Sequence, residues 1–416
     1  MKKFYLSAAV LFLCVTAGAK ESEDALEFYQ AQSRLVSENR RQDQAYAAAL
    51  ADSLAVWQKR FPQDKQNKDA LLLQADLFVR AQDYPSALAA LLKSHYLFPV
   101  PNDSALLGSR VEAVMNELDK DQKGQALKLL AANVDALNKE QRQEAYLRAL
   151  YSIDTPDMYA VTALEIDDFL AQNPGYAQND KIEILYGDLH RRNHNPMAAA
   201  AQYKKVGALY PKTNYKAAST RMAADVYADD LKDPQTATAM YNQVLKNYPD
   251  SVEIGVVYKH LGIMEENNKN YENALAYYDK AIQMLEGKPA AYDAMIGKAD
   301  VYAKMKDYQS AYNTLVQTAD AFNENEEKYV STMLKAAEVA DRRLKDRSQK
   351  SVTLEKILLA YPQTRHAPEI MFELGYCYEK QGKIVQAAAM YKKLILAYPT
   401  DTFAEKAQPR LDRLNK

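Results

Sequence analysis

The stretch from Met371 to Pro399 carries apolar residues every three to four positions, in two blocks separated by a short polar turn. This spacing predicts two amphipathic α-helices that pack against each other. Gly382 supplies a permissive backbone for the turn, and Tyr398 is expected to end the second helix because a residue before proline is pushed out of the α region. The inward positions are expected to be Leu374, Gly375 and Tyr378 in the first helix, and Ala387, Tyr391 and Leu394 in the second.

The same hairpin pattern recurs along the chain at intervals of about 37 residues or multiples of it. Its most visible marker is an aromatic residue followed by proline, at Phe61-Pro62, Phe98-Pro99, Tyr210-Pro211, Tyr248-Pro249, Tyr361-Pro362 and Tyr398-Pro399, with Asn173-Pro174 on the same grid. A second column consists of alanines that precede the grid points by a constant interval, at Ala87, Ala199, Ala237, Ala274, Ala311 and Ala387. The two columns predict about ten helical hairpins, the last ending near Pro399.

Short polar residues stand where the second helix of several hairpins should begin. They are Asp83, Asn195, Asp233, Asn270 and Asp307. The side chains of Asp and Asn accept hydrogen bonds from the first N–H groups of a helix, so we expect these residues to be N-caps.

The order Leu374-Gly375, Tyr378, Ala387, Tyr391 and Pro399 resembles the tetratricopeptide repeat. The resemblance implies an all-α, right-handed solenoid of about ten helix-turn-helix repeats. The segment Tyr-Pro-x-[Ser/Thr], at residues 248–251 and 361–364, is similar to a bacterial envelope subclass, namely the repeats of the Tol-Pal-associated cell-division coordinator and of the β-barrel assembly lipoprotein.

We expect the repeat array to cover residues 20–399, with degenerate units near 100–175 and 325–362. Two helices are still expected in those units, at Gln125–Leu137 and at Val352–Ala360. Residues 400–416 are expected to form a closing helix, because the last repeat cannot leave its apolar face bare. Its apolar side would carry Phe403, Ala407, Leu411 and Leu414.

The N-terminus has the layout of a signal peptide over residues 1–19: two lysines, an apolar run from Phe4 to Val15, and small residues before Lys20. The apolar run is too short to span a bilayer as a helix. A short membrane anchor and lipidation of Cys14 remain alternatives, although the bulky Leu13 disfavours a lipobox. We expect export to the periplasm, with secretion or peripheral association with the outer membrane as alternatives.

Composition limits the chemistry. The chain of 416 residues has 53 Lys and Arg against 55 Asp and Glu, a formal charge of -2, which argues against a nucleic-acid partner. No later stretch is apolar enough for a transmembrane segment. No phosphate-binding loop, nucleophile elbow or zinc-protease motif occurs, so we expect neither enzymatic activity nor a cofactor. Cys377 is interpreted as a buried filler of the repeat core.

One histidine pair has a spacing that metal sites use. His190 and His194 lie four residues apart beside Asp188, on one face of a predicted helix. Two arginines separate the histidines, and no further ligand is apparent nearby. We therefore interpret the pair as a solvated helix end and expect no metal.

The concave surface of such an array is lined by first helices, so their off-core positions are the candidates for partner binding. In three units these are Arg191, Arg192, Lys259, Glu266, Phe372, Tyr376 and Glu379. Phe372 and Tyr376 have an alternative role, packing against the closing helix. The favoured function is an exported scaffold that binds protein or peptide partners of the cell envelope. The alternative is a non-catalytic glycan-binding or accessory subunit of an envelope enzyme complex.

Overall fold

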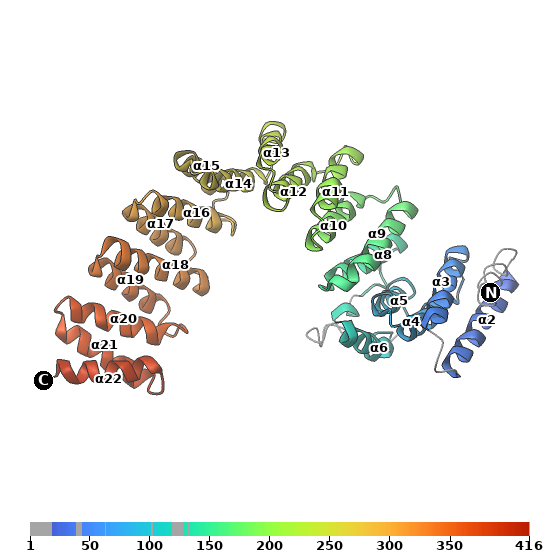
Figure 1. Ribbon diagram of the computed structural model, residues 1–416, viewed down its shortest axis with the longest axis horizontal. Coiled ribbons are helices and arrows are strands. Elements are labelled where there is room, and N and C mark those ends of the chain that lie inside the picture. The colour runs from blue at the N-terminus through green and yellow to red at the C-terminus, as the bar shows by residue number, and fades with distance from the viewer. Residues whose placement is uncertain are drawn as a thin grey trace. The chain divides into compact units, whose positions relative to one another are not determined.

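The computed structural model describes residues 19–38, 44–62, 64–100, 103–118, 128–131 and 133–415. Over these residues the protein contains 20 α-helices and no strand, which confirms the predicted all-α solenoid fold (Figure 1). The predicted signal peptide lies outside these residues except for its last position. Within the described part of the chain, no helix combines the length and the apolar character that crossing a membrane requires.

The chain forms two compact units, residues 1–219 and 220–416. The described helices of the N-terminal unit are α2 (Ala19–Glu38), α3 (Gln44–Arg60), α4 (Asn67–Ala81), α5 (Tyr84–Leu97), α6 (Asp103–Leu118), α8 (Lys139–Ser152), the short η2 (Pro156–Met158), α9 (Tyr159–Gln172), α10 (Asn179–Arg192) and α11 (Pro196–Leu209). Helix α12 (Lys216–Asp229) contains the boundary. The C-terminal unit continues with α13 (Pro234–Asn247), α14 (Ile254–Asn267), α15 (Tyr271–Met284), α16 (Ala291–Lys304), α17 (Tyr308–Ala321), α18 (Glu326–Val339), η3 (Ala340–Leu344), α19 (Arg347–Ala360), α20 (Ala367–Lys380), α21 (Ile384–Ala397) and α22 (Thr402–Leu414).

In three hairpins a glycine of the first helix faces a tyrosine of the second helix. The pairs are Gly187 with Tyr203, Gly262 with Tyr278, and Gly375 with Tyr391. A Cβ atom on these glycines would lie 2.5, 3.0 and 2.6 Å, respectively, from the nearest ring atom. Such distances are shorter than van der Waals contact, so only glycine allows the two helices to approach this closely.

Local hydrogen bonds start most of the second helices as predicted. Four of the five expected N-caps accept a hydrogen bond from the backbone N–H three residues on: Asp83, Asn195, Asp233 and Asp307. Asn270 is the exception, because its side-chain amide donates to Glu265 at 2.9 Å instead. The N-cap hydrogen bonds are therefore set by the local sequence, but a nearby carboxylate can accept a hydrogen bond from the capping side chain and prevent the cap.

The prediction of a helix over Gln125–Leu137 is wrong. In the described part of that stretch only the first two residues are helical, and the chain turns at Leu130. Side chains of other helices bond to the carbonyl oxygens there: the hydroxyl of Tyr96 donates to Leu129 at 2.7 Å, and that of Ser104 donates to Leu130 at 2.9 Å. These tertiary bonds satisfy the carbonyl groups that a continued helix would have used. The helix predicted over residues 352–360 is confirmed within α19.

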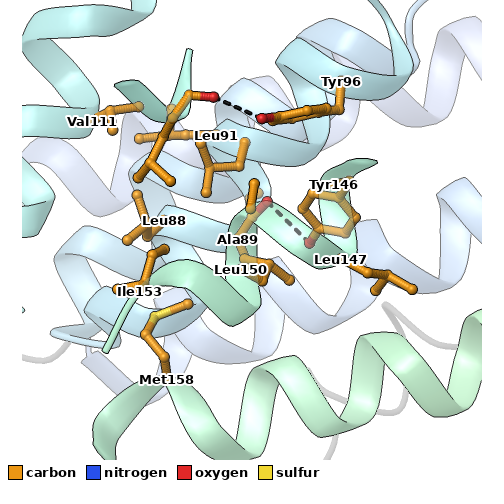
Figure 2. Close-up of a cluster of buried hydrophobic side chains, with 14 of the residues drawn as sticks. Leu88, Ala89, Leu91, Tyr96, Val111, Tyr146, Leu147, Leu150, Ile153 and Met158 are labelled. Carbon is orange, nitrogen blue, oxygen red and sulfur yellow. Dashed lines mark hydrogen bonds between the residues drawn. The ribbon is translucent and has the colours of Figure 1, made fainter. Parts of the chain in front are cut away.

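The core of the N-terminal unit is built around α5. Leu88, Ala89 and Leu91 of this helix are buried among side chains of α6, α8 and η2, including Val111 and Tyr146 (Figure 2). The hydroxyl of Tyr146 donates to the carbonyl oxygen of Ala89 at 3.3 Å. A helix that is apolar on all sides requires neighbours on all sides, and α5 packs against α4, α6, α8 and α9.

The C-terminal unit is a more regular stack, in which each helix packs mainly on its neighbours in sequence. Helix α22 closes the stack: Ala404 and Ala407 are buried, and Phe403, Leu411 and Leu414 pack against the same core. The predicted closing helix is therefore confirmed, and its role is to cover the apolar face of the last hairpin.

Candidate functional site

A cavity of about 700 Å³ opens in the N-terminal unit between α3, α4, α5, α8 and α9. Most of its surface is apolar and includes Leu71, Phe78, Phe98, Leu147, Val161 and Leu164. The remainder carries charged side chains of both signs, among them two lysines paired with two carboxylates. Concave sites with an apolar lining and few polar groups are typical of ligand binding.

Two ion pairs join α9 to the opposite side of the cavity. The Nζ atom of Lys93, on α5, lies 2.8 Å from both carboxylate oxygens of Glu165. The Nζ atom of Lys59, on α3, lies 2.7 Å from Asp168, nearly one turn further along α9. The side chains of the first pair are 29% and 18% exposed, against 61% and 32% for the second. The inner pair is therefore less screened by water and contributes more to holding α9 in place.

Two glutamines and a buried tyrosine form part of the cavity lining. The side-chain amide of Gln74 donates to the carbonyl oxygen of Ala51 at 2.9 Å, and that of Gln58 donates to Gln74 at 3.3 Å. Tyr146 is buried beneath the ammonium group of Lys93, whose Nζ lies 5.8 Å from the ring centroid. Burial, together with the charge of Glu165, raises the pKa of Tyr146 well above its usual range. The phenol of Tyr146 thus stays protonated at neutral pH.

The predicted groove residues Arg191 and Arg192 lie at the end of α10 and do not line the cavity. The guanidinium group of Arg192 lies over the ring of Tyr151, 4.3 Å from its centroid, and 3.6 Å from the carboxylate of Asp154. Arg191 is half-buried. Arg192 therefore already joins its helix to the preceding α8, and a role of either arginine in partner binding stays a prediction.

Lys259 and Glu266 lie between successive hairpins of the C-terminal unit. The ammonium group of Lys259 lies 3.6 Å from the carboxylate of Asp293, on α16. Glu266 accepts a hydrogen bond from the Tyr278 hydroxyl at 2.6 Å and pairs with Lys304 of α16 at 2.7 Å. Both residues thus connect one repeat to the next, and their role in binding stays a prediction as well.

Phe372, Tyr376 and Glu379 face the closing helix. The ring of Phe372 lies 5.7 Å from that of Phe403, the guanidinium group of Arg410 lies 4.6 Å from the centroid of Tyr376, and Arg410 pairs with Glu379 at 2.9 Å. Phe372 and Tyr376 therefore pack against the closing helix, which is the alternative role that the sequence left open. A partner that bound these three side chains would compete with α22, so binding here remains a prediction.

The interpretation of His190 as a solvated residue is wrong. Its side chain is buried, stacked on Tyr186 with ring centroids 4.4 Å apart, and its Nδ1 lies 2.9 Å from the hydroxyl of Tyr159. Burial lowers the pKa of His190. The preceding helix α9 covers this end of α10, which the sequence of α10 alone could not indicate. Among the described residues no group of three metal-ligating side chains occurs.

Cys377 fills the core of the last hairpin as predicted. The thiol is buried, and this burial raises its pKa to about 11. A thiol with such a pKa is protonated at neutral pH and is a poor nucleophile.

The four charged residues that define the cavity were not among the predicted site residues. Lys59, Lys93, Glu165 and Asp168 belong to three different helices and come together only through the packing around α5. No motif joins them in the sequence. A weak signal was available: the irregular region near residues 100–175 interrupts the repeat, and such interruptions often carry binding sites.

Comparison with known families identifies tetratricopeptide repeats in the C-terminal unit. Residues 221–251 and 369–401 match one model described as a tetratricopeptide repeat, and residues 265–326 match a second model with the same description. The first two segments cover most of the hairpins α12–α13 and α20–α21, and the third runs from the end of α14 through α15, α16 and α17. These three segments of the chain are therefore similar to tetratricopeptide repeats. No match was found among curated protein sequences.

Two of the solved structures with a similar fold are described as tetratricopeptide-repeat proteins. The C-terminal part of such a protein from Cytophaga hutchinsonii is 15% identical, with a TM-score of 0.45, and the match covers 63% of this chain and 98% of that one. A second, from Parabacteroides merdae, is 15% identical with a TM-score of 0.38, covering 66% and 100%. PilF from Pseudomonas aeruginosa is 16% identical with a TM-score of 0.35, covering 56% and 97%. These similarities concern the fold alone.

Proposed function

We propose that this protein is a non-catalytic scaffold of the bacterial cell envelope, which captures a protein segment in the cavity of its N-terminal unit. The observation that carries the proposal is the cavity itself, with its apolar wall and paired charges. Tetratricopeptide repeats imply protein partners, because stacked hairpins present long surfaces and seldom carry catalytic groups.

The chemistry of the cavity favours an extended, amphipathic segment. Phe78, on α4, and Leu164, on α9, offer apolar contact from two different helices. The carboxylate of Glu165 and the ammonium group of Lys93 bond to each other in the free protein. A segment with charges of both signs can exchange these bonds for its own, while its apolar side chains displace water from the wall.

The proposed location rests on the sequence of residues 1–19, which has the layout of a cleaved signal peptide. The protein is expected to begin at Lys20 after export and to meet its partners in the periplasm. Measuring the intact mass of the protein recovered from a periplasmic extract tests this. Acyl groups on Cys14, or retention of the whole chain in the cytoplasm, would contradict the proposal.

Site-specific photo-crosslinking in living cells tests the cavity. Leu164 is 60% exposed on the cavity wall, so a benzoyl-phenylalanine placed there should crosslink to the captured protein. Leu106, on α6, is 68% exposed but does not line the cavity, and it is the matched control. We expect one dominant adduct from position 164 and none of that mass from position 106.

The variant Lys93→Gln then probes the role of the inner ion pair. It should reduce the adduct at position 164 while the protein still folds, because Gln keeps much of the side-chain volume. Its far-ultraviolet circular dichroism is the check on folding. Equal crosslinking from positions 164 and 106, or an adduct that Lys93→Gln leaves unchanged, would contradict binding in the cavity.

A further inference from the structure

The second helices of the last two repeats leave apolar side chains exposed on their outward sides. On α21 the buried positions are Ala387, Tyr391 and Leu394, and the opposite face is open. We name the outward residues of both helices the outward stripe, and it consists of Val352, Lys356 and Leu359 on α19, with Val385, Lys392, Lys393 and Leu396 on α21. Leu359 is 86% exposed and Leu396 is 72% exposed, values far above those of a packed leucine.

The equivalent positions of the preceding repeats are polar. Leu359 and Leu396 each stand three residues before the proline of a Tyr-Pro pair. At the same repeat position α13 has Lys246, α15 has Gln283 and α17 has Asp320, all exposed. The repeat itself does not require leucine here, because three other repeats in the same unit fold with polar residues. Among these five repeats of the C-terminal unit, leucine at this position is thus confined to the last two.

The outward stripe is also cationic. Lys356, Lys392 and Lys393 are exposed, and none of them pairs with a carboxylate in the described part of the chain. Helix α21 contains no acidic residue, and α19 contains only Glu355, which accepts a hydrogen bond from the Tyr378 hydroxyl at 2.6 Å. Lysine ammonium groups that form no salt bridge therefore lie beside the exposed aliphatic side chains.

A shallow hollow lies on α21 within this region, lined by Ala389, Lys392, Lys393, Leu396 and Ala397. It offers no deep pocket for an anchoring aromatic side chain. Protein interfaces are enriched in aromatic residues and Arg and are depleted of Lys. The outward stripe has the reverse composition, with Leu, Val and Lys and no aromatic residue or Arg. Aliphatic residues flanked by lysines are the composition of surfaces that rest on anionic lipid.

From this composition we propose that the outward stripe docks the protein onto an anionic phospholipid bilayer. The leucine and valine side chains enter the boundary between headgroups and acyl chains, and the lysine side chains extend to the lipid phosphates. The docking is peripheral, because these helices are packed into the repeat stack on their other faces. It is independent of the cavity in the N-terminal unit and does not rest on the function proposed for it.

Vesicle co-sedimentation tests the docking with the chain from Lys20 onward, so that the apolar run of residues 4–15 cannot itself bind lipid. The probes are vesicles of phosphatidylcholine alone and vesicles with phosphatidylglycerol added. We expect binding to the anionic vesicles only, and weaker binding as sodium chloride rises, because salt screens the lysine charges. The double variant Lys392→Gln, Lys393→Gln should weaken binding about 25-fold, since each lysine near an anionic surface contributes about fivefold.

The double variant Leu359→Ser, Leu396→Ser should also weaken binding, by about tenfold or more, because it removes the aliphatic insertion. Val252→Ser is the matched control: Val252 is 74% exposed but lies outside the outward stripe, so this variant should bind like the unmodified chain. Circular dichroism should give the same melting temperature for all of these proteins, because every substituted side chain is exposed.

Three outcomes would overturn the proposal. The first is no sedimentation with anionic vesicles. The second is binding that the lysine and leucine variants leave unchanged. The third is a concentration-dependent dimer in light scattering that the leucine variant abolishes, with no vesicle binding, because the outward stripe would then contact a second copy of the chain. None of these results depends on whether position 164 crosslinks to a partner.

Discussion

Helices α5 and α21 are both the second helix of a repeat, yet they have opposite surroundings. In α5 all residues from Ala87 to Leu92 are buried, whereas in α21 burial is confined to one stripe, Ala387, Tyr391 and Leu394. Helix α5 packs against α4, α6, α8 and α9, whereas α21 packs against α20 and α22. The repeat pattern thus determines where a helix begins and ends, and its neighbours determine how many of its sides are buried.

The two surroundings create different surfaces. Around α5, the helices of an irregular region close on one another and leave a cavity crossed by ion pairs to Glu165 and Asp168. Around α21, a regular stack leaves no comparable enclosure, and the outward side of the helix remains open. In this protein the cavity lies where the repeat becomes irregular. The regular repeats differ mainly in the side chains on their exposed faces.

The largest effect that distinguishes the two regions is expected from matched leucine truncations. Leu88 of α5 and Leu394 of α21 are both fully buried. Leu→Ala changes in cores cost about 2–5 kcal/mol, and more when the surroundings cannot collapse. We expect Leu88→Ala to lower the free energy of unfolding by about 4 kcal/mol, because α5 has packed helices on all sides. Leu394→Ala should lower it by about 2–3 kcal/mol, because α22 can move into the space that the missing side chain leaves.

Hydrogen exchange measured by mass spectrometry shows which helices each truncation destabilises. Leu88→Ala should raise exchange across α4, α5, α8 and α9 together, and Leu394→Ala mainly in α20 to α22. If both truncations changed exchange only within their own hairpin, the result would contradict the claim that α5 is coupled to more helices than α21.

A smaller effect is expected at the close contact of a regular hairpin. A Cβ atom on Gly262 would lie 3.0 Å from the ring of Tyr278, which is itself buried. Gly262→Leu should therefore lower the free energy of unfolding by about 1–3 kcal/mol, because the ring must move in a packed core. Gly175, with no heavy atom within 4 Å of its Cβ position, is the control for a glycine change without crowding. An unchanged melting temperature for Gly262→Leu would contradict the close helix contact.

The smallest effect concerns pH and compares one histidine from each unit. His190 is buried and His260 is half-buried, and desolvation lowers the pKa of both below the usual 6.5. Each stays neutral in the folded chain while its unfolded counterpart takes up a proton, so the stability associated with it is present above about pH 6.5 and is lost as the pH falls below that value. His260→Gln should therefore lessen the decrease in melting temperature between about pH 7 and pH 5 in the C-terminal unit only.

Exchange rates measured in both units at the two pH values provide the check, because the N-terminal unit retains His190 and acts as the internal control. If His260→Gln left the acid sensitivity of the C-terminal unit unchanged, that sensitivity would come from a group other than His260. Equal changes in both units would contradict the assignment to one imidazole.

Much of the fold was predictable because its determinants are local. The grid of aromatic-proline pairs marks the ends of second helices, Asp83 and Asp233 cap theirs, and Gly375 marks a close contact with Tyr391. Each of these signals acts over at most about one hairpin, a range over which the sequence order and the spatial order coincide. The helix α22 was predictable for the same reason, since Phe403, Ala407, Leu411 and Leu414 recur at helical spacing directly after the last hairpin.

The cavity and the surroundings of His190 could not be predicted in this way. Lys93 meets Glu165 across helices that the repeat period alone does not bring together, and His190 is covered by Tyr159, which lies outside the sequence of its own helix. The sequence by itself determined the helices, their turns, their caps and the repeat they form. Only the tertiary structure decided that the stretch after Leu129 would leave the helix, that α5 would be enclosed on all sides, and which charges would meet across the cavity. The physical reason is that these contacts depend on packing between helices distant in sequence, whose energies no local pattern of residues records.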